Sequence, residues 1–117
     1  MEVDIELNVA LTRELAERMR KQLHDHFDLY GAPGTGNFTL RRQMPSTGYL
    51  TVDQIVQNYM SALEPVRHFL ADTTGTLRIG AYAAADEQTA FSIILGNNTV
   101  AHLASYRLAI DLTCHRL

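Results

Sequence analysis

Residues 51–70 read TVDQIVQNYMSALEPVRHFL and carry the strongest helical pattern in the chain. Thr51 and Gln54 form a capping box, in which each side chain accepts a hydrogen bond from a backbone N–H at the helix start. Behind them the apolar residues recur at helical spacing on one face: Val52, Ile55, Val56, Tyr59, Met60, Leu63, Val66 and Leu70. Pro65 interrupts this pattern and removes one backbone hydrogen bond, so we predict a kink or a restart near Leu63.

The two ends of the chain alternate strictly between apolar and polar residues. Residues 2–9 place Val3, Ile5, Leu7 and Val9 on one face, and residues 106–115 do the same with Tyr106, Leu108, Ile110, Leu112 and Cys114. A period of two is typical of a strand with one buried face. We therefore predict a strand at each end, with Cys114 as a buried structural thiol.

A second helix is predicted between the first strand and a glycine-rich segment. Thr12 caps it, it ends near His26, and one apolar residue recurs in every four: Leu15, Met19, Leu23 and Phe27. Glycines and a proline break all periodicity over residues 30–36. The alternation of residues 38–42 then predicts a short strand at an edge of the sheet.

The rest of the chain predicts a hairpin and a short helix. Residues 77–83 and 90–95 read as its two antiparallel strands, and Asn97 or Asn98 caps a helix through Ala104.

The predicted order of elements is therefore β-α-β-α-β-β-α-β. It indicates an α+β fold of the ferredoxin-like kind, with a mostly antiparallel sheet and helices on one face. With 117 residues the chain has room for one core, so we expect a single domain over residues 1–117.

The formal net charge is −3, which provides no positive field for phosphates. We therefore expect no nucleic-acid partner and no attraction to an anionic membrane. The first ten residues lack the basic and apolar regions of an export signal, and no apolar run approaches the roughly 20 residues of a membrane span. With one cysteine in the chain, a cytoplasmic location is the expectation.

The segment YGAPGTGNF, residues 30–38, resembles the phosphate-binding loop of the AAA+ class of nucleotide hydrolases. In that family a lysine and a serine or threonine follow the last glycine, where they neutralise phosphate charge and hold magnesium. Here Asn37 and Phe38 occupy those two positions, and neither side chain can do this. We expect a glycine-rich connection rather than a nucleotide site.

The densest group of metal-ligand residue types is His24, Asp25, His26 and Asp28. On a helix, His24 and Asp28 share one face while His26 points elsewhere, so too few ligands converge for zinc. We predict no metal and no cofactor.

No local spacing places a nucleophile beside a base, so no catalytic residue is predicted. His68 and His102 stand alone on predicted helices. An enzyme would need a pocket joining one of them to a carboxylate such as Asp111 or Glu64.

Five residues in and after the glycine-rich loop are the candidates for binding a small anionic ligand or an acidic partner surface: Gly34, Gly36, Asn37, Arg41 and Arg42.

Residues 50–115 resemble the bacterial domain-of-unknown-function family 4279 at the level of pattern. The resemblance rests on the segments LTVDQ at 50–54, LEP at 63–65 and LAIDL at 108–112, with Leu103-Ala104 before the last of them. It implies a ferredoxin-like architecture and no catalytic residues. The first half departs from the family, because it has no tryptophan and carries the glycine-rich loop.

Three classes of function stay open. We favour a non-catalytic intracellular protein-binding or inhibitor module of the immunity or anti-defence type, acting through a surface as a homodimer formed by its hydrophobic terminal strands. The alternatives are a regulatory module that binds a small molecule or nucleotide, and a compact enzyme with a pocket at a dimer seam.

Overall fold

The computed structural model describes residues 2–23, 27–31, 36–42, 51–71, 73–83 and 93–116, and it is α+β, as predicted. The strands are β1 (Glu2–Ala10), β2 (Phe27–Gly31), β3 (Asn37–Arg42), β4 (Gly75–Ala83) and β5 (Ala109–Arg116). The helices are α1 (Arg13–Gln22), α2 (Val52–Leu63), the 3-10 helix η1 (Glu64–Val66), α3 (Arg67–Leu70) and α4 (Asn97–Ser105).

The strands form one five-stranded sheet in the order β2-β3-β1-β4-β5. β1 lies between β3 and β4 and is antiparallel to both, and β2 is antiparallel to β3. β4 and β5 run parallel. The sheet is therefore mixed rather than mostly antiparallel, and the observed succession of elements differs from the predicted β-α-β-α-β-β-α-β.

The parallel pair β4 and β5 replaces the predicted hairpin. Parallel neighbours need a long crossover, and α4 lies within it. The pairing of residues 77–83 with 90–95 is wrong, because β1 and β5 occupy both edges of β4 and residues 93–95 are not in a strand. Residues 90–92 lie outside the described chain. A short apolar run in a sequence does not show which strand it pairs with, and for this reason the predicted hairpin pairing was wrong.

β2 lies where the first helix was expected to end. Thr12 caps α1 as predicted, but α1 stops at Gln22 rather than near His26. Phe27, which continues the helical repeat in the sequence, is the first residue of β2. Because β2 pairs with the outer side of β3, residues 38–42 form an inner strand and the predicted edge position is wrong.

The predicted start and break of the long helix are confirmed. Thr51 and Gln54 make both hydrogen bonds of the capping box, and α2 ends at Leu63. Pro65 lies in η1, after which α3 carries the buried face on to Leu70.

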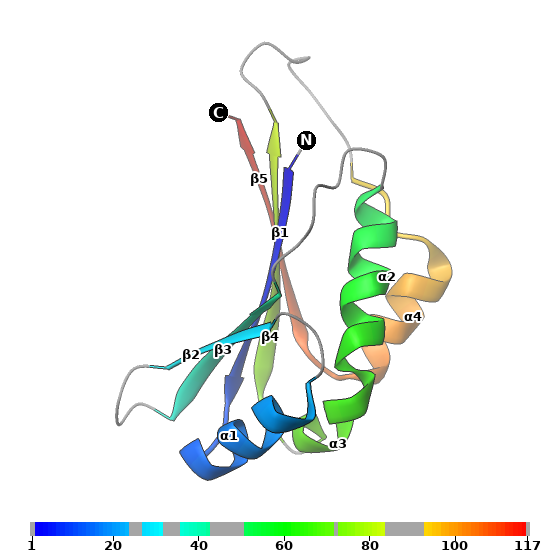
Figure 1. The fold of residues 1–117 in the computed structure, drawn as a ribbon. Helices are drawn as coiled ribbons and strands as arrows, with labels where there is room; N and C mark the ends of the chain where they lie inside the picture. Colours follow the sequence, from blue (N-terminus) through cyan, green and yellow to red (C-terminus); the bar gives the residue numbers. More distant parts are fainter. Residues whose placement is uncertain are drawn as a thin grey trace.

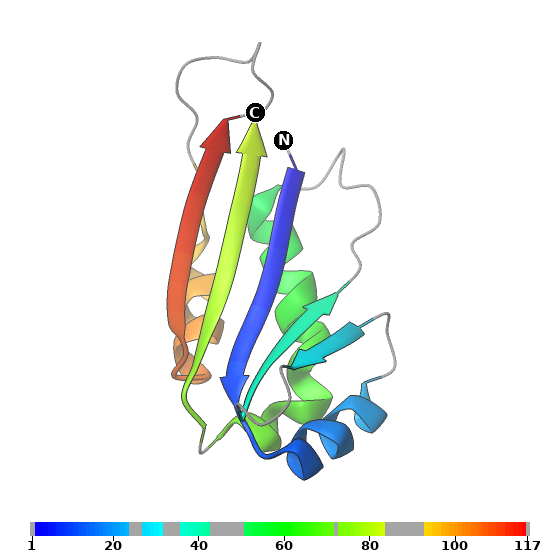
Figure 2. The same cartoon turned by 90° about the vertical axis from the view of Figure 1, so that its left-hand side faces the viewer.

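The helices α2 and α4 cover one face of the sheet, as predicted, and α1 and α3 lie at the end where β1 finishes (Figure 1). The opposite face carries no helix in the described chain (Figure 2). The core lies between the sheet and α2. The fully buried Tyr59 of α2 donates a hydrogen bond to the carbonyl oxygen of Leu40 in β3 at 2.8 Å.

The start of α4 differs from the prediction, because Gly96 rather than Asn97 or Asn98 is its N-cap. Asp53 of α2 accepts the N–H of Gly96 at 2.7 Å, so a carboxylate from another helix lies at this N-terminus. Hydrogen bonds from Thr99 and from Gly96 lower the pKa of Asp53. Across the described ranges, no helix has both the length and the apolar character needed to cross a membrane.

Candidate functional site

β5 forms one edge of the sheet, and in the described residues it pairs with β4 only. Ile110 and Leu112 lie opposite Leu77 and Ile79 of β4, so they share the helix-bearing face. Their neighbours on β4 are fully buried, whereas Ile110 is 43% and Leu112 45% exposed. The edge therefore presents apolar side chains beside a row of backbone groups without a partner strand.

Cys114 belongs to the same apolar row and is exposed, so its predicted burial is wrong. Its partner in the register is Ala81, which is fully buried. Alternation in the sequence shows which residues share a face, but it does not show whether another element covers that face. Among the described residues, the elements that cover β4 do not extend over the outer side of β5.

A row of alternating charge crosses the uncovered face of the sheet. In the register, Asp28 of β2 lies opposite Arg41 of β3, and Arg41 lies opposite Glu6 of β1. Glu6 then lies opposite Arg78 of β4, and Arg78 lies opposite Asp111 of β5 at 3.5 Å between Nε and Oδ2. The row changes sign at every strand and ends at the β5 edge on a carboxylate.

Beside this row, a hollow of 290 Å³ opens on the same face around Gly80. The ring of Tyr82 lies against Gly80, since a Cβ there would be 3.3 Å from the tyrosine ring. Tyr82 also stacks on His115 of β5, with the ring centroids 5.0 Å apart. The two faces of the β5 edge therefore differ: one is apolar, and the other is polar with an aromatic pair.

The predicted binding residues of the glycine-rich loop are only partly described. Gly34 lies outside the described residues. Gly36 has φ 68°, and its carbonyl oxygen accepts the N–H of Leu11 at 3.0 Å. Asn37 begins β3. The loop end is thus fastened beside the N-terminus of α1, and its role in binding stays a prediction.

The predicted arginines lie apart from Gly36. Arg41 is on the uncovered face of the sheet and forms an ion pair with Asp4, with 3.2 Å between Nε and Oδ1. Arg42 ends β3, and its side chain is outside the described part of the structure. An anion approaching Arg41 would compete with Asp4, so this arginine is not a preformed anion site.

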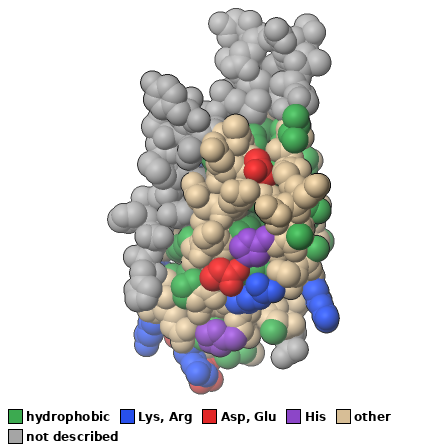
Figure 3. Space-filling model, turned by 90° about the vertical axis from the view of Figure 1, so that its right-hand side faces the viewer, with side chains coloured by type: hydrophobic (Ala, Val, Ile, Leu, Met, Phe, Trp, Pro, Cys, Tyr) green, Lys and Arg blue, Asp and Glu red, His purple; other side chains and the backbone are tan. Residues whose placement is uncertain are grey.

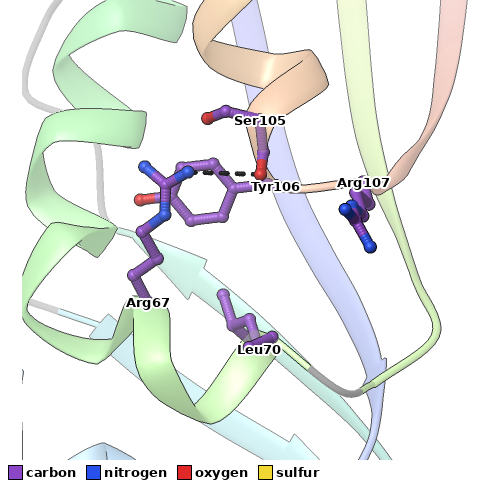
Figure 4. A pocket seen from close by; sticks show the side chains of 6 residues that line it. Arg67, Leu70, Ser105, Tyr106 and Arg107 are labelled. Carbon is purple, nitrogen blue, oxygen red and sulfur yellow. Dashed lines mark hydrogen bonds between the residues drawn. The ribbon is translucent and has the colours of Figure 1, made fainter.

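A second polar cluster joins η1 to α4 on the helix-bearing face, where acidic, basic and histidine side chains lie together (Figure 3). One carboxylate oxygen of Glu64 accepts from the Tyr106 hydroxyl at 2.9 Å and lies 2.5 Å from Nε2 of His102. Arg67 lies 3.5 Å from the same oxygen and donates to the backbone carbonyl of Ser105 at 3.2 Å. Its guanidinium lies across the Tyr106 ring (Figure 4), 4.5 Å from the centroid.

These contacts shift two ionisation equilibria. The hydrogen bond from His102 is the main reason why the pKa of Glu64 lies below its ordinary value, and Tyr106 and Arg67 act in the same direction against partial burial. Burial, followed by the hydrogen bond to Glu64, raises the pKa of Tyr106. Near neutral pH, Glu64 is therefore a carboxylate and Tyr106 a neutral donor.

The structure makes one of the contacts that an enzyme would need, because His102 meets Glu64. However, the adjoining hollow of 270 Å³ is lined by residues 67, 70, 71 and 105–107, not by this pair. The Ser105 hydroxyl donates to the backbone carbonyl of His102 at 2.6 Å, so it is turned toward the main chain. The cluster is an interhelical tie; nothing in the local sequence spacing signals it, since Glu64 and His102 are 38 positions apart.

In the described part of the chain, no three His, Cys, Asp or Glu side chains are grouped so that they could hold a metal ion. The cluster considered in the sequence falls largely outside those residues, because His24, Asp25 and His26 are not described.

Comparison with known proteins found no matching family model, no matching curated protein and no matching solved structure. The resemblance to the domain-of-unknown-function family 4279 therefore stays a prediction.

Proposed function

We propose that this protein is a protein-binding module that recognises its partner through the edge of β5. The observation that carries the proposal is the exposure of Ile110 and Leu112 along an edge strand of eight residues. An exposed edge with apolar side chains is a template for another strand, because the new strand supplies both hydrogen bonds and apolar contact. This edge fits the expected non-catalytic role in binding or inhibition.

The first partner that we propose is a second copy of the chain, giving a homodimer in which two β5 strands lie antiparallel. A two-fold axis through Leu112 places Ile110 opposite Cys114 and Asp111 opposite Thr113. Apolar residues then lie opposite apolar residues, and polar residues lie opposite polar residues. An axis through Asp111 would instead place two carboxylates opposite each other, which is destabilising. We therefore favour the register centred on Leu112.

Sedimentation velocity over a range of concentrations tests the dimer. We expect the wild type to associate and Leu112→Lys to remain monomeric, because a lysine at the centre of the seam disfavours edge pairing. Val100→Lys is the matched control: Val100 is 51% exposed but lies on α4, so this variant should associate like the wild type.

A wild type that stays monomeric at the highest attainable concentration would contradict the homodimer. Capture from the native cell with wild type and Leu112→Lys as baits then tests the inhibitor role. That role predicts a second protein held by the wild type and lost with the lysine variant, and recovery of the same chain alone would contradict it.

A further inference from the structure

A separate hollow of 660 Å³ lies between α1 and α3, at the end of the molecule where β1 finishes (Figure 1). The two hollows described above are smaller, with volumes of 270 and 290 Å³. The volume of 660 Å³ lies within the usual range of about 300–1,000 Å³ for small-molecule sites. Its wall is formed by Ala10 at the end of β1, the first turns of α1, Gly36 just before β3, and α3.

Apolar side chains make up the floor of this hollow. Leu11 is 8% exposed, Phe69 packs against the core, and Leu15 is 36% exposed. The buried side of α1 is formed by Ala16 and Met19, so Leu15 faces the hollow instead of the core. Leu15 therefore leaves apolar surface available to a ligand.

The wall carries one cationic side chain and one histidine. Arg18 of α1 and His68 of α3 both line the hollow, and no Asp or Glu is among the described residues that do so. The described structure gives Arg18 no ion pair, whereas Arg13 on the same helix lies 3.8 Å from Glu17. A guanidinium over an apolar floor favours a ligand with one anionic group.

The backbone around the hollow is already hydrogen-bonded. Ala10 donates to the carbonyl of Thr74 at 3.1 Å, and Leu11 donates to that of Gly36 at 3.0 Å. The Thr73 hydroxyl donates to the carbonyl of Ala10 at 2.5 Å. The wall is thus held in place, and the anionic group of a ligand has to be recognised by the side chains of Arg18 and His68.

We infer that this hollow binds a small molecule with an apolar body and one carboxylate, such as a medium-chain fatty acid. The carboxylate lies against Arg18 and His68, and the chain covers Leu15 and Phe69. This assigns the small anionic ligand to Arg18 and His68 instead of Arg41 and Arg42. Of the residues expected to bind it that the structure describes, Gly36 lines the hollow, whereas Asn37 and Arg41 do not.

An NMR titration of the amide signals with octanoate, kept below its micelle concentration, tests the inference. We expect saturable shifts confined to the amides of residues 10–18, 36 and 68–73, weaker binding of octan-1-ol, and no binding of acetate. Arg18→Gln should weaken octanoate about tenfold and leave octanol unchanged, because it removes a charged hydrogen-bond donor. Leu15→Ser should weaken both ligands.

Arg20→Gln is the control, since Arg20 lies in the last turn of α1 and does not line the hollow. Equal loss of octanoate affinity in Arg18→Gln and Arg20→Gln, or shifts spread over the whole surface, would overturn the inference. Leu112→Lys should bind octanoate like the wild type, so this proposal and the one for the β5 edge fail independently.

Discussion

The carboxylate of Glu64 accepts hydrogen bonds from side chains that lie far from Glu64 in the sequence. His102 and Tyr106 reach it from 38 and 42 positions away, so local spacing gives no sign of the cluster. Single residues were predictable where their partners are close in sequence, as with Thr51 and Gln54. They were not predictable where the partner comes from another helix, as with Asp53 at the N-terminus of α4.

Replacing Glu64 by glutamine should change how stability depends on pH. The folded-state pKa of Glu64 is depressed, so its contribution is present above the ordinary value of 4.5 and is lost as the pH falls through the folded-state value. At neutral pH we expect Glu64→Gln to lower the free energy of unfolding by about 1 kcal/mol. Urea unfolding followed by circular dichroism between neutral pH and about pH 3 measures both effects.

The loss of stability on acidification below pH 4.5 should be smaller in Glu64→Gln than in the wild type. Glu14→Gln, on the exposed side of α1, is the control and should keep the wild-type profile. If Glu64→Gln followed the wild-type pH profile in full, the cluster would contribute no stability through this carboxylate.

At the scale of elements, the long helix was predictable because its cap, its apolar face and its break at Pro65 are all local features. The strand β2 and the crossover connection through α4 were not predictable from the sequence. The apolar spacing of Phe27 fits a helix as well as a strand, and the parallel partner of β4 lies beyond α4 in the sequence. Strand pairing depends on residues that are distant in the sequence, which periodicity does not record.

Tyr59→Phe tests the tie between α2 and the sheet. The variant keeps the ring, which packs edge-on against Phe27, and loses the buried hydrogen bond to Leu40. We expect the free energy of unfolding to fall by about 1 kcal/mol, as is usual for one neutral hydrogen bond. Chemical denaturation of the wild type and the variant measures this change in the free energy of unfolding.

Tyr30→Phe is the matched control, because the hydroxyl of Tyr30 is exposed and lies 3.4 Å from Asp28. It should change the free energy of unfolding by less than about 0.5 kcal/mol. Equal effects of the two tyrosine variants would mean that the tie to β3 does not stabilise the fold.

At the scale of the whole molecule, the candidate interaction surface follows from strand order. The alternation of residues 106–115 predicted a strand and its two faces, but the strand begins only at Ala109. Its edge position and the exposure of Leu112 depend on which strand lies beside it and on how far the helices reach. Neither of these is a property of the local sequence.

The one cysteine of the chain reports on the proposed dimer, because Cys114 is exposed on β5. In the register centred on Leu112, Ile110 of the second copy would cover it. We expect the rate of reaction with Ellman's reagent to fall as the concentration of the wild type rises. In Leu112→Lys the rate per thiol should not depend on protein concentration, and a concentration-independent rate in the wild type would contradict the proposed seam.

The alternating charges on the uncovered face also discriminate between ways of ordering the strands. If β1 lay beside β2, Glu6 would meet Asp28, and if β3 lay beside β4, Arg41 would meet Arg78. Each such contact between like charges would cost up to about 1 kcal/mol. The observed order β2-β3-β1-β4-β5 gives opposite signs at every pairing. The row therefore penalises the simple meander, in which strands would pair in the order in which they are synthesised.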